Sequence, residues 1–199
     1  MPTVLDFDEL DVLASTLYRE TENLPAEERK KRICDELEDI LLYCYVFGIN
    51  RVHESAELTE EERAKYQPSG EAIYDTLYMP VDGEDFRQRV SRRIDEGTLG
   101  EYELQRIVET DGHRVSETGA YETAELVSYE TGMQFEKVWE TMRDPRVRDT
   151  HDYLQSMRVG LDEFFVTYNG NKTKFPGEFG IAEEDCNCRC WCEYQPKKK

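Results

Sequence analysis

The sequence has little positive charge and no long apolar segment, and both absences exclude classes of protein. Its 199 residues contain 25 Lys and Arg against 44 Asp and Glu, which gives a formal charge of −19. General binding to duplex DNA needs a basic surface that neutralises phosphates, and anionic membranes repel an acidic one. The longest apolar run covers residues 40–49, far below the roughly 20 residues of a membrane span. We therefore expect protein partners, no membrane contact and no general duplex DNA binding, although such charge can also serve solubility alone.

The sequence also lacks a recognisable targeting segment. The start, Met1 to Asp6, carries no basic region of the kind that opens a signal peptide. We therefore expect synthesis in a cytoplasm, where clustered cysteines hold metal or stay free more often than they form disulfides. The 12 Tyr, 8 Phe and 2 Trp argue against wholesale disorder, because disordered chains have few aromatic residues.

The common catalytic signatures are missing as well. The stretch 170–173, Gly-Asn-Lys-Thr, lacks the upstream glycine of a phosphate-binding loop, and His53-Glu54 lacks the second histidine of a zinc protease. The stretch 101–103, Glu-Tyr-Glu, is similar to the acidic pair of ADP-ribosyltransferases, but its place at a predicted helix start favours a charged first turn. We expect a protein that is not an enzyme. An enzyme or effector, for example one like an ADP-ribosyltransferase, and a standalone metal-binding adaptor are the alternatives.

The first two thirds of the sequence show helical periodicity. Apolar residues recur at helical spacing in several runs. The predicted helices cover about 7–21, 25–50, 71–78 and 99–130, with shorter ones after Thr59 and around Val90. The pairs Thr59 with Glu62 and Thr98 with Glu101 match the capping-box pattern. Within the longest helix, Gly112 and Gly119 are candidate kink sites.

From about Met133 the pattern changes to short strands and turns. Strands or turns are predicted at residues 135–139, 159–166, 168–171 and 188–193. Asp144-Pro145 predicts the start of a helix that runs to about Met157, with Asp as the N-cap and Pro at the first helical position. Helices followed by short strands predict the fold class α+β, with a helical N-terminal part followed by a small mixed domain with short strands.

Four of the six cysteines alternate within residues 186–192, as C-N-C-R-C-W-C. On a strand, this alternation would place all four thiols on one face. His151 lies on the apolar face of the helix predicted after Asp144, either as a core histidine or as a ligand near the cysteines. The best zinc ligands are then His151, Cys188 and Cys190, but a structural zinc normally takes four protein ligands and the fourth is not evident. We therefore expect a metal-free cluster, either small buried residues that pack a final strand or a disulfide formed only on oxidation; zinc is the alternative.

Several short motifs occur in order along the second half of the chain. They are Trp139-x-Thr141, Asp144-x-Arg146-x-Arg148-x-x-His151, Pro176-Gly177 and Asn187-Cys188-Arg189-Cys190. Together they resemble the phage Mu F-like family of head morphogenesis, or minor capsid, proteins, in which the final N-C-R-C is the most specific piece. The stretches 83–87 and 106–119 resemble the helices that precede this core, so the resemblance covers roughly 83–192. In this sequence Glu109 stands where the family more often has Arg, and Cys186 and Cys192 are additional to N-C-R-C.

The resemblance implies a phage or prophage protein that is present in few copies per head, near the portal. Its implied partners are portal or capsid proteins, and its implied location is the interior of the phage head, after synthesis in the host bacterial cytoplasm. It divides the chain into a helical N-terminal extension (1–82), a Mu F-like domain (83–194) and a basic tail (195–199). The implied motif core is Trp139, Asp144, Arg146, Arg148, His151, Asn187, Cys188, Arg189 and Cys190.

The motif core should meet in space, although about forty residues separate its two parts. We expect Trp139, Arg148 and His151 to lie against residues 187–190. Arg148 should find a carboxylate or backbone carbonyls, because an unpaired buried charge is costly.

Overall fold

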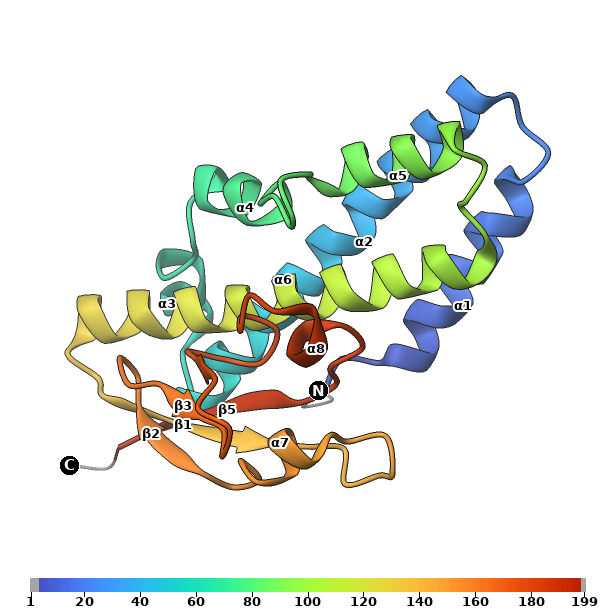
Figure 1. Ribbon diagram of the computed structural model, residues 1–199. Helices are drawn as coiled ribbons and strands as arrows, with labels where there is room; N and C mark the ends of the chain where they lie inside the picture. The colour runs from blue at the N-terminus through green and yellow to red at the C-terminus, as the bar shows by residue number, and fades with distance from the viewer. Residues whose placement is uncertain (1–3, 198–199) are drawn as a thin grey trace.

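Helices form the first two thirds of the chain and short strands the last third (Figure 1). The structure is a computed structural model and describes residues 4–197. The helices are α1 Phe7–Thr21, α2 Ala26–Ser55, α3 Glu60–Lys65, α4 Gly70–Leu77, α5 Phe86–Asp95, α6 Glu101–Thr131, α7 Asp149–Asp152 and α8 Ala182–Asp185. The strands are β1 Phe135–Glu140, β2 Arg158–Gly160, β3 Phe165–Val166, β4 Lys172–Thr173 and β5 Trp191–Pro196. The α+β prediction is confirmed, since no named strand precedes Met133 within the described residues.

Helix α6 is the centre of the fold. In Figure 1 it runs across the molecule, with α4 and α5 on one side and the sheet on the other. Its first half, through Val115, packs with α1, α2 and α5 in a helical core. Its second half, from Ala120, packs with the strands in a second core. Although α2 and α6 are long, no helix within residues 4–197 has both the length and the apolar character to cross a membrane.

The crossing of α2 and α6 explains the glycines that the sequence marks as candidate kink sites. Helix α6 is uninterrupted along its length. A Cβ atom on Gly119 would lie 2.7 Å from the carbonyl oxygen of Tyr45, and one on Gly48 only 2.0 Å from that of Ser116. Gly112 also faces α2. These positions therefore lack side chains because the two helices approach closely there, not because the helix bends.

The helix caps confirm one predicted capping box and contradict the other. Thr59 and Glu62 form the expected reciprocal pair at the start of α3. The capping box predicted for Thr98 and Glu101 is wrong, because α6 begins after Gly100, which offers no side-chain cap. The Thr98 hydroxyl bonds back at 3.4 Å to a carbonyl of α5. Thr98 therefore belongs to the end of the preceding helix.

Two small antiparallel sheets make up the strand part. The larger has the order β2-β1-β5, and β3 with β4 forms a separate hairpin. The central strand β1 pairs along its whole length with β5, from Phe135 opposite Pro196 to Glu140 opposite Trp191. Strand β5 thereby continues past residue 194 into the segment predicted as a tail. The end of that segment, residues 198–199, lies outside the described residues.

The segment after β1 departs from the prediction. The helix expected from Asp144 to about Met157 is wrong, because only the single turn Asp149–Asp152 is helical. The Asp144 carboxylate accepts the backbone N–H of Arg146 at 2.9 Å and closes a local turn instead of capping a helix. The backbone N–H of Ser156 then donates to the Trp139 carbonyl at 2.7 Å. Pairing with β1 therefore replaces further helical turns.

The cysteine segment is not one straight strand. Strand β5 begins only at Trp191, and Cys186 is the C-cap of α8. Asn187 has a left-handed φ of 55°, which turns the chain between the two. The prediction that all four thiols share one face is therefore wrong. Cys186 is half-buried and separated by this turn, while the other three are buried.

Candidate functional site

Three side chains that can ligate a metal meet between α7 and the segment that leads into β5. The Nδ1 atom of His151 lies 3.5 Å from the Sγ atom of Cys188 and 3.5 Å from that of Cys190. The three residues are 1%, 2% and 3% exposed. We call them the His–Cys cluster. Within residues 4–197 no other group of three such ligands comes equally close.

Short elements and aromatic rings position these side chains. The single turn of α7 carries His151, and Cys188 and Cys190 are two residues apart, so both thiols reach the same imidazole nitrogen. The Trp139 indole from β1 packs edge-on against the imidazole, with ring centroids 5.4 Å apart. The Phe179 ring stacks on the imidazole at 5.5 Å. The cluster therefore lies in an aromatic, water-poor environment.

The second nitrogen of the imidazole meets a buried carboxylate. His151 Nε2 lies 3.1 Å from Glu184 Oε2. Glu184 accepts hydrogen bonds from the Thr150 hydroxyl at 2.8 Å and from the Asn171 amide at 2.9 Å. Burial alone would raise the pKa of Glu184, but these hydrogen bonds and the adjacent His151 bring it below its usual value. A carboxylate that favours its ionised form therefore lies against the second nitrogen of the imidazole.

The two cysteines hold their protons unequally. Burial opposes ionisation of Cys188, but the hydrogen bond with Cys190 and the rings of His113 and His151 hold the pKa of Cys188 well below its usual value. The same hydrogen bond, together with burial, raises the pKa of Cys190. Of the two thiols, Cys188 is therefore the more acidic. The thiolate is the form of cysteine that binds metals.

Helix α6 anchors the cysteine segment through two polar side chains. His113 Nε2 donates to the carbonyl oxygen of Cys190 at 2.6 Å. Glu117 accepts the backbone N–H of Cys192 at 2.9 Å and pairs with Arg51 of α2 at 2.6 Å. The side chains of Arg51 and Glu117 are only 10% and 2% exposed. This buried pair therefore connects α2, α6 and the start of β5.

The charged residues of the motif lie at the edge of the cluster. Arg189 donates to both carboxylate oxygens of Asp144, at 2.8 and 2.7 Å. Arg148 donates to the backbone carbonyl of Cys186, which is the kind of partner expected for it. Arg146 is exposed and reaches Asp144 only at 3.8 Å. The first two contacts tie the loop after β1 to the cysteine segment.

The structure brings together part of the predicted motif core and adds residues that were not predicted. Arg146 and Asn187 are exposed and lie outside the contact between Trp139 and the cluster. The unpredicted members are His113, Glu117 and Glu184. The first two are four residues apart on α6, and polar residues at helical spacing on a buried face are a usable signal. Glu184 gives no such signal, because it lies within the acidic run 183–185.

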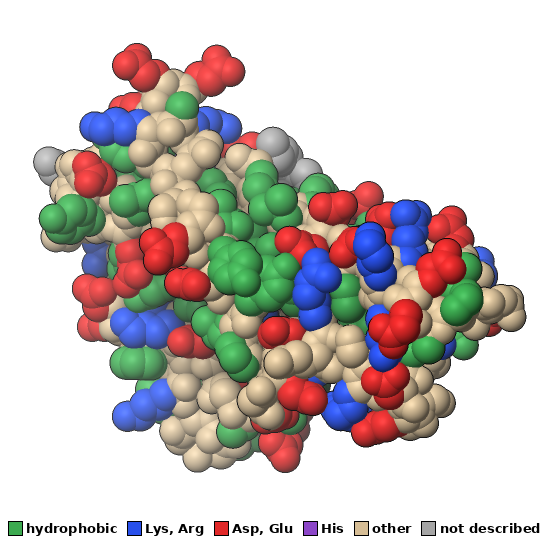
Figure 2. All heavy atoms as spheres, turned by 90° about the horizontal axis from the view of Figure 1, so that it is seen from above, with side chains coloured by type: hydrophobic (Ala, Val, Ile, Leu, Met, Phe, Trp, Pro, Cys, Tyr) green, Lys and Arg blue, Asp and Glu red, His purple; other side chains and the backbone are tan. Residues whose placement is uncertain are grey.

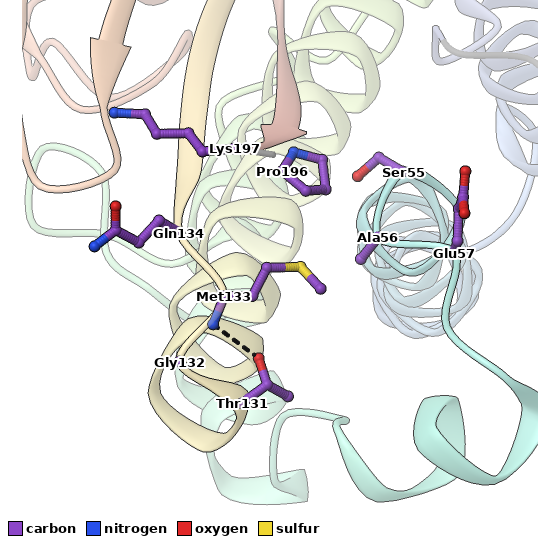
Figure 3. A pocket seen from close by; sticks show the side chains of 9 residues that line it. All are labelled: Ser55, Ala56, Glu57, Thr131, Gly132, Met133, Gln134, Pro196 and Lys197. Carbon is purple, nitrogen blue, oxygen red and sulfur yellow. Dashed lines mark hydrogen bonds between the residues drawn. The ribbon is translucent and has the colours of Figure 1, made fainter. Parts of the chain in front are cut away.

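A surface groove lies apart from the cluster, between the ends of α2 and α6 and the end of β5 (Figure 3). Its volume is about 690 Å³. Its lining residues include Met133 and Pro196, and the ionisable ones are Glu57 and Lys197. No residue of the His–Cys cluster lines it. The groove therefore gives no access to the chemistry of the cluster.

Comparisons with known proteins match the second part of the chain. A family model described as "Phage Mu protein F like protein" matches residues 80–193, a range that contains the whole His–Cys cluster. The Minor head protein GP7 of Bacillus phage SPP1 is 33% identical over 103 residues, which cover 52% of this chain and 32% of that protein. No solved structure matches.

A second curated protein is similar over a shorter segment. The NAD(+)--arginine ADP-ribosyltransferase EFV of Enterococcus faecalis (strain ATCC 700802 / V583) is 42% identical over 59 residues. These residues cover 30% of this chain and 12% of that protein. The chain therefore spans at most about a third of the length of either relative.

Proposed function

The protein belongs to the phage Mu protein F like family, and from this membership we propose that it is a minor head protein of a phage or prophage that acts in capsid assembly near the portal. The observation that carries the proposal is the 33% identity over 103 residues to a protein named as a minor head protein. Since the chain covers 32% of that relative, the place near the portal and the partners are part of the proposal. The implied location is the phage head.

The surface supports protein partners. Figure 2 shows acidic side chains spread over the face seen from above, mixed with basic ones, and hydrophobic side chains gathered near its middle. With a formal charge of −19, such a surface repels nucleic acid phosphates. Portal or capsid proteins are therefore the proposed partners, and DNA is not.

The burial of the cluster supports a structural role. The Cys188 thiolate would be the strongest nucleophile of the site, but its residue is only 2% exposed. A substrate would have to displace packed aromatic rings to reach it. We therefore propose that the cluster holds the domain together rather than turning over a substrate.

Deletion of the gene in its phage tests the head function. We expect fewer DNA-filled heads, with recovery when the gene is supplied in trans, and we expect few copies of the protein in purified heads. Electron microscopy counts the heads, and quantitative mass spectrometry counts the copies. Normal heads after deletion, together with absence of the protein from all head forms, would contradict the proposal.

Co-purification tests the partner. A tagged chain is co-expressed separately with the portal protein and with the major capsid protein of the same phage, and with the portal protein of an unrelated phage as a control. We expect retention of the matched portal protein or of the matched capsid protein, and none of the unmatched portal protein. Equal retention of matched and unmatched portal proteins would reject a specific contact.

The match to an ADP-ribosyltransferase defines the competing class. The activity in that name belongs to a protein of which this chain covers 12%. In this structure Glu101 and Tyr102 lie in the exposed first turn of α6, and Glu101 pairs with Arg19 at 3.5 Å. We expect no consumption of NAD+ by the purified chain, with or without arginine as acceptor. Sustained turnover would favour the enzyme alternative.

A further inference from the structure

The distances within the His–Cys cluster are those of a zinc site. A zinc ion with a Zn–N distance of about 2.0 Å and Zn–S distances of about 2.3 Å holds N and S about 3.5 Å apart at the tetrahedral angle. His151 Nδ1 lies 3.5 Å from Cys188 Sγ and 3.5 Å from Cys190 Sγ. All three ligand atoms lie within 4.8 Å of one another, so one ion can lie between them.

A second, independent observation concerns the other face of the imidazole. Nε2 of His151 has no conventional hydrogen bond but lies 3.1 Å from the buried Glu184 carboxylate. Histidines that ligate metals through one nitrogen commonly donate the N–H of the other to a carboxylate, which fixes the ring and strengthens the ligand. Glu184 is itself held by Thr150 and Asn171. The cluster therefore has the second layer of contacts that a metal site requires.

A third observation concerns charge and unpaired donors. One Zn²⁺ and two thiolates sum to zero charge, so the metal would remove the penalty of a buried thiolate among aromatic rings. The buried Nε1 of Trp139 has no hydrogen-bond partner within the described residues, and it belongs to the indole that packs edge-on against His151.

We propose that His151 Nδ1, Cys188 Sγ and Cys190 Sγ bind one Zn²⁺, with Glu184 orienting the histidine. Two sulfurs and one imidazole are a donor set that favours zinc over the hard cations calcium and magnesium. Within residues 4–197 no fourth His, Cys, Asp or Glu joins this group, so a water molecule completes the tetrahedron. The cysteine spacing alone favours a metal-free cluster; the three-dimensional placement of His151 and Glu184 favours the zinc alternative.

The site would connect segments that are distant in sequence. His151 follows β1, while Cys188 and Cys190 precede β5, which pairs with β1. A metal at this point would close the loop of residues between them and couple binding to folding of the strand part. This inference does not depend on the proposed head function, since it concerns the isolated chain.

Zinc content of the full chain is the first test. The protein is purified under reducing conditions, equilibrated with zinc, freed of loosely bound metal and analysed for metal per chain. We expect about one zinc per chain, lost in Cys188→Ser, Cys190→Ser and His151→Gln. Cys186→Ser is the matched control, because Cys186 lies in the same segment but outside the cluster, and it should keep the metal. Less than a tenth of a zinc per chain in the native protein, or retention by all three ligand variants, overturns the proposal.

A second measurement avoids variants that fail to fold. The native protein is treated with an alkylating reagent before and after a chelator, and each cysteine is followed by mass spectrometry. We expect the chelator to speed alkylation of Cys188 and Cys190 by at least tenfold and to leave Cys34 and Cys44 unchanged, although these are equally buried. Cobalt in place of zinc should give a sulfur-to-metal charge-transfer band that disappears in Cys188→Ser. Alkylation that does not respond to the chelator, with no cobalt spectrum, also overturns the proposal.

Discussion

The helical core and the strand-side core of this molecule are stabilised in different ways. The helical core is a large cluster of aliphatic and aromatic side chains, and the charges buried beside it, Asp111 and Arg114, pair with each other, while Asp111 also pairs with Arg89. On the strand side the buried charges have mainly uncharged partners: Lys137 donates to two backbone carbonyls, and Glu184 accepts from a hydroxyl and an amide. Apolar contacts add up over many neighbours, whereas a buried charge depends on a few specific partners. A substitution on the strand side should therefore lower the free energy of unfolding by more per atom removed than a substitution in the helical core.

The largest expected effect is at the pair that joins the two cores. Arg51→Met removes the partner of Glu117 and leaves a buried carboxylate with only the N–H of Cys192. Breaking a buried ion pair in this way costs about 3–5 kcal/mol of unfolding free energy. Denaturant titration measures it. Arg32→Met is the control, since its pair with Glu36 is 53% and 41% exposed and should contribute less than about 0.5 kcal/mol. Equal losses in both variants would show that burial does not strengthen the dependence of stability on the Arg51–Glu117 pair.

A second test changes only packing, where α2 crosses α6. Gly48→Ala places a methyl group 2.0 Å from the carbonyl oxygen of Ser116, so the two backbones must separate. We expect a loss of about 2–3 kcal/mol of unfolding free energy, measured by denaturant titration. The control is Gly70→Ala, because no atom lies within 4 Å of the added methyl group there. It should instead stabilise the protein by about 0.5 kcal/mol. A neutral Gly48→Ala would show that the helices do not touch at this point.

The same difference between the cores explains how much the sequence predicts. The helical part follows from local rules, because apolar residues at i and i+4 lie on one face whatever the tertiary structure. The first helix, predicted as 7–21, is Phe7–Thr21 in the structure. The glycines of α6 show the limit of this approach, since their reason is a contact with α2 that no local pattern contains.

On the strand side, local rules predict less. The position of β1 is predicted, because alternation and aromatic residues mark it. The length of α7 is not predicted correctly. The Asp144 carboxylate accepts hydrogen bonds from Arg189, 45 positions away, as well as from its own turn, and no local pattern contains the first contact. The motif indicates that His151 and the cysteines belong together. The role of Glu184 requires the three-dimensional placement of α8 beside α7, which no spacing in the sequence contains.

Lys137 gives a pH-dependent test of the strand-side core. Lys137 is 0% exposed, and its Nζ donates to the backbone carbonyls of Glu163 and Lys174, both at 2.8 Å. Burial lowers the pKa of Lys137 from 10.5 to about 8. Between these values the unfolded chain binds more protons than the folded one, so the contribution of Lys137 to stability rises with pH.

Comparison with Lys137→Met isolates this contribution. The buried cysteines and tyrosines whose pKa is raised make the folded state less stable as pH rises. These groups are common to both proteins, so their effect cancels in the difference between the two unfolding free energies. We expect the native protein to gain about 1–2 kcal/mol relative to the variant between pH 8 and pH 10. Denaturant titrations at several pH values measure the difference. A difference that does not change with pH would mean that Lys137 keeps its ordinary pKa.

The smallest expected effect lies at helix starts in the helical part, where contacts are local and exposed. Asp85 caps α5: its carboxylate accepts the backbone N–H of Gln88 at 2.8 Å, and the Gln88 side chain accepts that of Asp85 at 3.0 Å. Asp85→Ala should therefore cost about 1 kcal/mol of unfolding free energy. Thr98→Ala is the matched comparison, because the sequence pattern marks Thr98 as a cap but the structure places it before Gly100. Its expected effect is below about 0.5 kcal/mol. If Thr98→Ala is the more damaging of the two in denaturant titration, α6 begins at Thr98 in solution and the local pattern is the better guide there.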